Sequence, residues 1–555
     1  MDKHYVMTYR KKAKALLTFL IVICILLLTA CSEKTDKNNK NSSVSGGSSQ
    51  NSTSSGNSQS EDTSSDDTTV SNSDVKKELR ETFNVTDNIS NRGDGSAATE
   101  LIGDIPANCA KLSNPITGFC DAEADKMRNN ILNTRNTEEV YKITGTKYYV
   151  SGKGNDDNSG MSADKPLKTV DAIDKINLKA GDAVLFERGY VFRITRPINV
   201  VEGVTYGAYG KGAKPVICGS PGNYANASLW KPTKKKNVWQ LDFSYPEAAC
   251  LIFDYGKEIG YARRMGLQQF SYNGEFYHNN DYGYFFLYCD KGNPGKIYKS
   301  IEISTQGSLF YVDAPNVTID NLCLKYSGNF AVNGRPNVDN INITNCEMGY
   351  IGGADYNTRN SRYGNAIQFW QGCTNINVSN NWIYQTFDTA ITWQGKGTKK
   401  EFAVYKNIYF NNNLLEYNNC DYELWDSEYS SIENFTMKDN IMRFTSMGWG
   451  TRPNDFGIRG IEGPILATLE PMQIKSFLIK DNIIDTPGRE IIKLKYTQSQ
   501  APQFTITGNK VYVNSAYRGT ELVTVYSENR FNAKNQSDLE KAFSQFGRDT
   551  VVLWK

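Results

Sequence analysis

Histidine is almost absent from this chain of 555 residues, which contains only His4 and His278. A zinc centre with three histidine ligands is therefore excluded, and a Ser-His-Asp triad has at most one candidate imidazole outside the N-terminal leader. An excess of charge of either sign is also lacking, because 62 Lys and Arg face 60 Asp and Glu, for a formal net charge of +2. This balance argues against a nucleic-acid binder that works through bulk positive charge.

The N-terminus has the pattern of a secretion signal. Arg10, Lys11, Lys12 and Lys14 precede an apolar run of 16 residues, 15–30, which is short for a membrane-spanning helix. The run ends in Leu28-Thr29-Ala30-Cys31, which resembles the lipobox of bacterial lipoproteins. The resemblance implies cleavage before Cys31 and a diacylglycerol on its thiol, which would hold the protein on the outer face of the cell membrane. The alternative is an ordinary signal anchor with a chance cysteine.

Aromatic residues are missing between Leu20 and Glu81. Residues 32 to about 75 are mostly Ser, Thr, Asn, Gly and Asp, a composition that cannot offset the entropy lost on ordering. We therefore predict a signal peptide at 1–30, a disordered tether at 31–75 and a lead-in segment at 76–145.

Cysteine pairing cannot be complete, because nine of the 11 cysteines follow Cys31 and nine is an odd number. Cys109 and Cys120 lie in a loop-like region and could form a disulfide. Cys323 and Cys346 lie within apolar repeats, which favours a role as small core residues.

A nine-residue unit recurs through the second half of the chain, with the order Asn, apolar, x, apolar, x, polar, Asn, x, apolar. Its copies begin at residues 316, 340, 375, 407, 434, 476 and 503. Alternating apolar positions predict strands with one buried face, and intervals of 24 residues and more predict a solenoid with insertions. The second Asn of the unit falls at a turn, where stacked amides can hydrogen-bond from coil to coil; these residues are Asn381, Asn413, Asn440, Asn482 and Asn509.

The entry to this region runs from a strand at 148–150 through a short helix at 170–176 to the Gly-rich 207–210. This order resembles the N-terminal entry of right-handed parallel β-helix proteins of the pectate-lyase-like superfamily, in which the early helix caps the open end of the core. We predict an all-β right-handed parallel β-helix over 146–515, with loop insertions and a C-terminal cap at 516–555.

Three predicted strands that follow the Asn turns can be aligned so that their apolar residues occupy alternate, equivalent positions. They are Ile367-Gln368-Phe369-Trp370, Ile391-Thr392-Trp393-Gln394 and Tyr422-Glu423-Leu424-Trp425. Sliding the third strand by one residue would bury Glu423, so Gln368, Thr392 and Glu423 should face outward in one column. Trp393 should then face the core.

Carboxylates and aromatic residues are dense around this column, and hydrolysis of a glycosidic bond needs two carboxyl groups. Asp388 and Glu423 come from adjacent coils and are the predicted catalytic pair, with Glu416 in reserve. Predicted substrate-binding residues are Arg362, Gln368, Trp370, Thr392, Gln394, Trp425 and Arg452. Each also has a structural interpretation: a turn cap for Asp388, a solvated strand residue for Glu423, packing for the tryptophans and ion pairs for the arginines.

The segments 362–370 and 383–392 resemble a recurrent pattern of secreted bacterial β-helix glycosidases, which implies an enzyme that acts on an extracellular polysaccharide or oligosaccharide. In that pattern an acidic residue often stands where this chain has Gln368. A polysaccharide lyase using Arg362 or Arg452, with calcium, and a non-catalytic glycan-binding β-helix remain open. Asp156-Asp157-Asn158 could bind calcium, although a polar turn explains it as well. Otherwise we expect no metal or cofactor, no nucleic-acid partner and a monomer.

Overall fold

The computed structural model describes residues 100–101, 116–262, 270–279, 282–354, 363–451, 463–467, 472–488, 490–494, 503–517, 521–525, 529–544 and 549–555. All of these belong to one unit of the chain, 70–555. The predicted leader, Cys31 and the tether lie outside the described residues.

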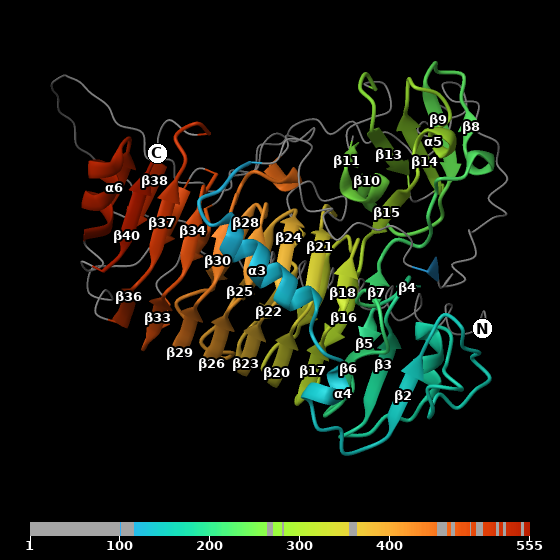
Figure 1. Ribbon diagram of the computed structural model, residues 1–555, viewed down its shortest axis with the longest axis horizontal. Helices are drawn as coiled ribbons and strands as arrows, with labels where there is room; N and C mark the ends of the chain where they lie inside the picture. Colours follow the sequence, from blue (N-terminus) through green and yellow to red (C-terminus); the bar gives the residue numbers. More distant parts are fainter. Residues whose placement is uncertain are drawn as a thin grey trace, which may run out of the picture. The chain divides into compact units, whose positions relative to one another are not determined.

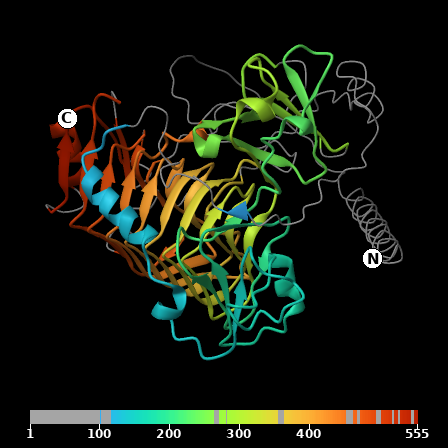
Figure 2. The same cartoon turned by 45° about the vertical axis from the view of Figure 1, so that its right-hand side comes forward.

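The chain winds into a right-handed parallel β-helix, as the repeat predicted (Figures 1 and 2). Each coil contributes one strand to each of three sheets, called sheets 1, 2 and 3 in the order in which the chain passes through them. Strands of successive coils pair in parallel. In sheet 1, for example, Ile343 pairs with Ile319 of the previous coil and Val378 of the next, and all three side chains are buried. Alternate apolar residues thus stack on one another inside the coils and form one continuous core.

The strands of sheet 1 are, in spatial order, β2 (Lys147–Val150), β3 (Ala183–Glu187), β6 (Thr205–Tyr209), β17 (Val317–Asp320), β20 (Val338–Thr344), β23 (Cys373–Ser379), β26 (Ala403–Asn411), β29 (Ser430–Lys438), β33 (Phe477–Lys480) and β36 (Phe504–Thr507), with β32 (Gln473–Ile474) beside β29. Those of sheet 2 are β1 (Glu100–Leu101), β4 (Tyr190–Arg193), β7 (Val216–Cys218), β18 (Cys323–Lys325), β21 (Glu347–Ile351), β24 (Trp382–Thr386), β27 (Leu414–Glu416), β30 (Ile441–Arg443), β34 (Ile483–Asp485), β37 (Lys510–Val513) and β40 (Val551–Trp554). Those of sheet 3 are β5 (Ile198–Asn199), β16 (Ser308–Val312), β19 (Phe330–Gly334), β22 (Ile367–Trp370), β25 (Thr389–Gln394), β28 (Cys420–Trp425), β31 (Ile465–Ala467), β35 (Glu490–Leu494), β38 (Glu521–Val525) and β39 (Asn529–Ala533).

A ladder of buried asparagines runs along the turn from sheet 1 to sheet 2. The side chains of Asn381, Asn413, Asn440, Asn482 and Asn509 hydrogen-bond in sequence, at 2.9–3.1 Å. The residue before each turn asparagine adopts a left-handed conformation, for example Asn412 with φ 55°. The predicted stacking of amides from coil to coil is therefore confirmed.

Short helices close both ends of the core. The predicted helix after Pro166 is the 3₁₀ helix η1 (Val170–Lys175), which adds Val170 and Ile173 to the core. At the other end α6 (Gln536–Phe543) adds Leu539 and Phe543. The strand ladder itself continues to β40, beyond the boundary that the sequence suggested near residue 515.

The lead-in segment packs against the solenoid through α3 (Asp121–Leu132) and α4 (Thr137–Val140). Arg128 of α3 binds Glu416 of β27, and Thr137 of α4 donates a hydrogen bond of 2.7 Å to Asp320. Cys120, just before α3, is a free, buried thiol that donates to Asp485, while Cys109 lies outside the described residues. Cys323 and Cys346 are buried core residues, as predicted. Among the described helices, none has the length and hydrophobicity needed to span a membrane.

A mostly antiparallel insert separates β7 from β16, and the sequence patterns did not reveal it. Its strands are β8 (Lys231–Pro232), β9 (Val238–Asp242), β10 (Ala248–Phe253), β11 (Glu258–Ile259), β12 (Tyr261–Ala262), β13 (Glu275–Asn279), β14 (Tyr284–Tyr288) and β15 (Ile301–Thr305), and its helices are η2 (Ala227–Leu229), η3 (Asp254–Gly256) and α5 (Pro294–Ile297). His278 is half-buried here, where its ring bonds to the Ala248 amide and the Phe243 carbonyl.

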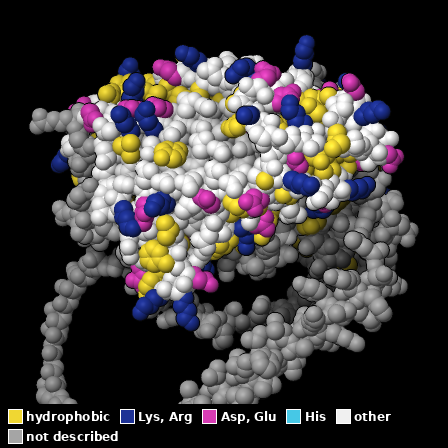
Figure 3. All heavy atoms as spheres, turned by 90° about the horizontal axis from the view of Figure 1, so that it is seen from below, with side chains coloured by type: hydrophobic (Ala, Val, Ile, Leu, Met, Phe, Trp, Pro, Cys, Tyr) yellow, Lys and Arg dark blue, Asp and Glu magenta, His cyan; other side chains and the backbone are white. Residues whose placement is uncertain are grey.

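The outer face of sheet 1 is polar. Thr318, Asn342, Asn377, Tyr409 and Thr436 lie in register across it. Figure 3, which views the molecule from below, shows few hydrophobic or charged side chains across the centre of the visible face. The outer face of sheet 3 differs from it, because it carries the carboxylate of Glu423 and the indoles of Trp370 and Trp425.

Candidate functional site

The outward column of sheet 3 has the predicted register. Gln368 of β22 pairs with Thr392 of β25, and Thr392 pairs with Glu423 of β28. The neighbouring positions Phe369, Trp393 and Leu424 face the core and are fully buried. Trp393 packs on Tyr422 with a ring separation of 5.1 Å, so its predicted inward orientation is confirmed.

Hydrogen bonds between coils hold the column in place. Thr392 Oγ1 donates to Glu423 Oε2 at 2.7 Å, and Gln394 Nε2 donates to Gln368 Oε1 at 2.6 Å. Glu423 is half-buried, whereas Thr392 is buried completely. The carboxylate of Glu423 is therefore held by Thr392 on a residue that remains partly accessible.

A second row lies two residues further along the same strands. Trp370, Gln394 and Trp425 are in register on successive coils, and all three are half-buried. The two indoles lie two coils apart, about 10 Å, and face the same way as Glu423. Flat apolar rings with a polar edge, separated by an amide, form a platform suited to sugar rings.

The platform continues toward the N-terminal coils through two residues that sequence reasoning missed. Arg335 follows β19 in line with Trp370, and its guanidinium carbon lies 5.2 Å from the ring centroid of Tyr311 on β16. The available signal was the strand parity, which places Tyr311 and Arg335 on the same face as Gln368 and Trp370.

Asp388 lies in the two-residue link between β24 and β25 and is half-buried. Its amide donates to the Gly364 carbonyl, and its own carbonyl accepts from the Cys420 amide at 3.0 Å. Four residues along the strand and one coil separate Asp388 from Glu423, so their Cα atoms lie about 14 Å apart. The structure thus places Asp388 immediately before β25 and Glu423 beside Thr392 in the middle of that strand.

The backbone around this link is tightly packed. A Cβ on Gly352 would lie 2.2 Å from the Cα of Gly364 and 2.7 Å from the Cβ of Phe387, so this corner requires glycine. Next to it, a Cβ on Gly353 would lie 2.4 Å from the carbonyl oxygen of Ala249, which belongs to the insert. The insert therefore adjoins the corner that holds Asp388.

Glu416, the reserve candidate, does not belong to this site. It lies on β27 of sheet 2, where both carboxylate oxygens accept from Arg128 at 2.8 Å and Oε2 also accepts from Trp382 Nε1 at 2.8 Å. Burial tends to lower the pKa of Arg128, but the charges of Glu416 and Asp125 and their hydrogen bonds to the guanidinium together outweigh burial and raise that pKa. The carboxylate of Glu416 is only 3% exposed, so its role is an ion pair beneath α3.

Asp421 is a buried carboxyl on β28, two residues before Glu423 and on the same face. It accepts hydrogen bonds from Asn418 Nδ2 at 2.9 Å and from Thr445 Oγ1. Burial outweighs these bonds and raises the pKa of Asp421 to about 7. Its position next to Glu423 follows from the strand parity, but its burial does not.

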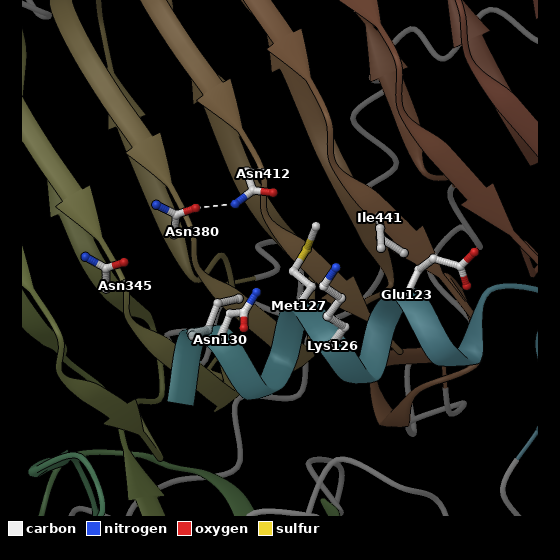
Figure 4. Close-up of a pocket in the computed structure, with 9 residues that line it drawn as sticks. Glu123, Lys126, Met127, Asn130, Asn345, Asn380, Asn412 and Ile441 are labelled. Atoms are coloured by element: carbon white, nitrogen blue, oxygen red, sulfur yellow. Dashed lines mark hydrogen bonds between the residues drawn. The ribbon is translucent and has the colours of Figure 1, made fainter. Parts of the chain in front are cut away.

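A separate depression of about 440 Å³ lies between α3 and the turn from sheet 1 to sheet 2 (Figure 4). Asn345, Asn380 and Asn412 line one side, and Met127 and Ile131 of α3 line the other. None of the predicted site residues contributes to it.

The other predicted binding residues, Arg362 and Arg452, lie outside the described residues. The predicted polar turn contains Asp156, whose carboxylate accepts from the amides of Lys168 and Thr169 and from the Thr169 hydroxyl. These three bonds lower the pKa of Asp156 although burial opposes them. In the described part of the chain, no cluster of three or more His, Cys, Asp or Glu side chains has the geometry of a metal site.

No model of a known protein family matches this chain, and no curated protein matches its sequence. Solved structures with a similar course of the chain include XylC in complex with xylose, at 12% identity and TM-score 0.39, covering 66% of this chain and 69% of that one. A rhamnogalacturonan lyase aligns at 11% identity and TM-score 0.33, covering 70% and 79%. The GH136 lacto-N-biosidase from Eubacterium ramulus aligns at 15% identity and TM-score 0.31, covering 78% and 71%. Because these likenesses are weak, the function has to be argued from the site itself.

Proposed function

We propose that this protein is a glycoside hydrolase that binds a polysaccharide or oligosaccharide along the outer face of sheet 3. The observation that carries the proposal is the position of Glu423, a half-buried carboxylate held by Thr392 beside the outward row of Trp370, Gln394 and Trp425. A fixed carboxylate next to half-buried, outward-facing aromatic rings suits cleavage of a bound glycan.

Asp388 and Glu423 are the proposed catalytic pair, one as the general acid and the other as the base. Carboxyl groups are about 5–5.5 Å apart in retaining glycosidases and about 6.5–9.5 Å apart in inverting ones. With Cα atoms about 14 Å apart, the two side chains must lean toward each other even to reach the longer spacing. The proposed reaction therefore inverts the anomeric configuration, with a water molecule between the base and the sugar.

The remaining assignments are proposals of the same kind. Gln394 supplies hydrogen bonds to sugar hydroxyls, and Arg362 and Arg452 bind the substrate from the adjoining loops. Thr392 and Gln368, which are both buried, hold Glu423 and Gln394 in place and do not contact the sugar themselves. Catalysis needs no metal or cofactor. A lipid at Cys31 anchors the enzyme, as a monomer, to the outer face of the cell membrane through the tether.

The test uses the protein without residues 1–75 on a panel of plant, algal and host glycans, with reducing ends and ultraviolet absorbance read together. We expect new reducing ends without absorbance. On the substrate found, Asp388→Asn and Glu423→Gln should each lower turnover by at least about 10²-fold while folding normally. Substrate binding should persist, because the tryptophan platform is unchanged. Proton NMR of the first product should show the inverted anomer.

Other outcomes distinguish the alternatives. An unsaturated product that absorbs in the ultraviolet, and that disappears with chelator, would identify a lyase. Binding without any product would identify a glycan-binding protein. Full activity of both variants on a confirmed substrate would move the chemistry away from Asp388 and Glu423.

A further inference from the structure

Asp421 is a buried carboxyl that lies two residues before Glu423 and one coil away from Asp388. It precedes Glu423 by two residues on the same face of β28, which places their Cα atoms about 7 Å apart. The residue is completely buried, so it cannot itself contact a substrate. Its importance for the site must therefore come from the groups that it holds.

The principal group that Asp421 holds is the side chain of Asn418. Asn418 Nδ2 donates to Asp421 Oδ1 at 2.9 Å and to the Ile383 carbonyl at 3.1 Å. Asn418 Oδ1, oriented by these two bonds, accepts the Thr386 amide of the preceding coil at 3.1 Å. Thr386 Oγ1 then donates to the carbonyl of Asp388 at 3.3 Å. A continuous chain of hydrogen bonds thus connects Asp421 with the backbone of Asp388.

The chain also fixes where the link between β24 and β25 begins. Without an acceptor at Asn418, the amide of Thr386 would be left unsatisfied in a buried position, which favours a shift of the backbone. Any shift there moves Asp388 relative to Glu423, because the strand beyond it stays paired with β28 through Thr389 and Cys420. Small displacements of a catalytic group cost large factors in rate.

We propose that Asp421 is a positioning residue of the catalytic site, which holds Asp388 at its working distance from Glu423 through Asn418 and Thr386. This inference rests on the proposed function, because it assigns Asp388 and Glu423 the catalytic roles. It adds a third carboxyl that acts without contacting the substrate.

The charges around Asp421 give this role a pH dependence. Glu416 of β27 raises the pKa of Asp421 in addition to burial, while Asn418 and Thr445 lower it. Glu423 on the same strand and Asp388 on the preceding coil are further carboxyl groups near it. Ionisation of Asp421 as the pH rises through about 7 adds a buried negative charge between two carboxylates, so turnover should fall there.

The matched control is Asp426, the residue immediately after β28. Asp426 is also buried, and it accepts bonds from the Gly397 amide at 2.8 Å and the Tyr405 hydroxyl at 2.7 Å. Asp421→Ala and Asp426→Ala therefore each remove one buried hydrogen-bond acceptor, but only Asp421 lies next to Asp388. Hydrogen–deuterium exchange compares them without a substrate, and kcat, KM and their pH profiles compare them with one.

In Asp421→Ala we expect amide exchange in residues 384–390 to accelerate about tenfold, whereas Asp426→Ala should affect residues 396–398. On the substrate found, Asp421→Ala should lower kcat about tenfold or more with KM nearly unchanged. Asp421→Asn keeps an acceptor for Asn418 and cannot ionise, so it should keep the kcat seen at low pH and lack the fall near pH 7. Asp426→Ala should keep both the kcat and the inflection.

Equal effects of the two alanine substitutions on exchange at 384–390, or equal kcat values, would overturn the positioning role. That result would leave the proposed function intact as long as Asp388→Asn and Glu423→Gln are inactive. If those two variants are active, the proposed catalytic pair is wrong, whatever Asp421→Ala shows.

Discussion

The asparagine ladder makes a quantitative prediction about the stability of the solenoid. Asn413 is completely buried, accepts from the amide and side chain of Asn381 at 3.0 and 3.1 Å, and donates to the Val378 carbonyl and Asn440 Oδ1 at 3.0 Å. Asn413→Ala leaves the Asn381 amide and the Val378 carbonyl without these partners. Each buried unsatisfied group costs about 1–3 kcal/mol, so the substitution should lower the free energy of unfolding by about 2–6 kcal/mol.

Asn407→Gly is the matched control for this prediction. Asn407 hydrogen-bonds to Asn375 and Asn434 in an exposed column, and its φ of 55° suits glycine. Water replaces the lost bonds there, so the cost should stay below about 1 kcal/mol. Urea unfolding followed by tryptophan fluorescence and circular dichroism measures both variants. If Asn413→Ala costs no more than Asn407→Gly, the buried ladder does not stabilise the stack in the way argued here.

Four further outcomes are expected. Glu416→Gln should lower the free energy of unfolding in urea by about 3–5 kcal/mol, because it leaves Arg128 and Arg443 partly unpaired. The folded variant should keep its kcat, and a variant that is stable but inactive would contradict this expectation. The pKa of Asp421 is raised from the ordinary 3.8 to about 7, so the folded state binds this proton more tightly than the unfolded state does. The free energy of unfolding should therefore fall by up to about 4 kcal/mol as the pH rises from about 4 to 7. In urea titrations Asp421→Asn should lack that part of the fall. Ile343→Asp should abolish the strand signal in circular dichroism, because it places an unpaired charge in the stacked core. Labelled palmitate should enter the wild-type protein in a bacterial host but not Cys31→Ala, and equal labelling would refute the lipid anchor.

The sequence by itself determined the solenoid, the asparagine ladder and the outward column of Gln368, Thr392 and Glu423. These features follow from local regularities, because period-2 alternation decides which side chains enter the core, and an asparagine at each turn repeats from coil to coil. The inward orientation of Trp393 was predictable for the same reason, because a shift of the strand alignment by one residue would have turned Glu423 toward the core.

Only the tertiary structure decided which carboxylates share an environment. Glu416 stands seven residues before Glu423, but the turn between β27 and β28 sends the two to different sheets. The partner of Glu416 is Arg128, 288 residues away, on a helix whose docking no local pattern encodes. The insert between β7 and β16 was missed because its short strands pair mainly with one another and do not follow the nine-residue unit. Burial of Asp421 depends in the same way on Asn418 and Thr445, which approach it from the same coil and the next one. Alternation along one strand is a local property, whereas ion pairs and burial depend on which coils and helices lie against each other in space.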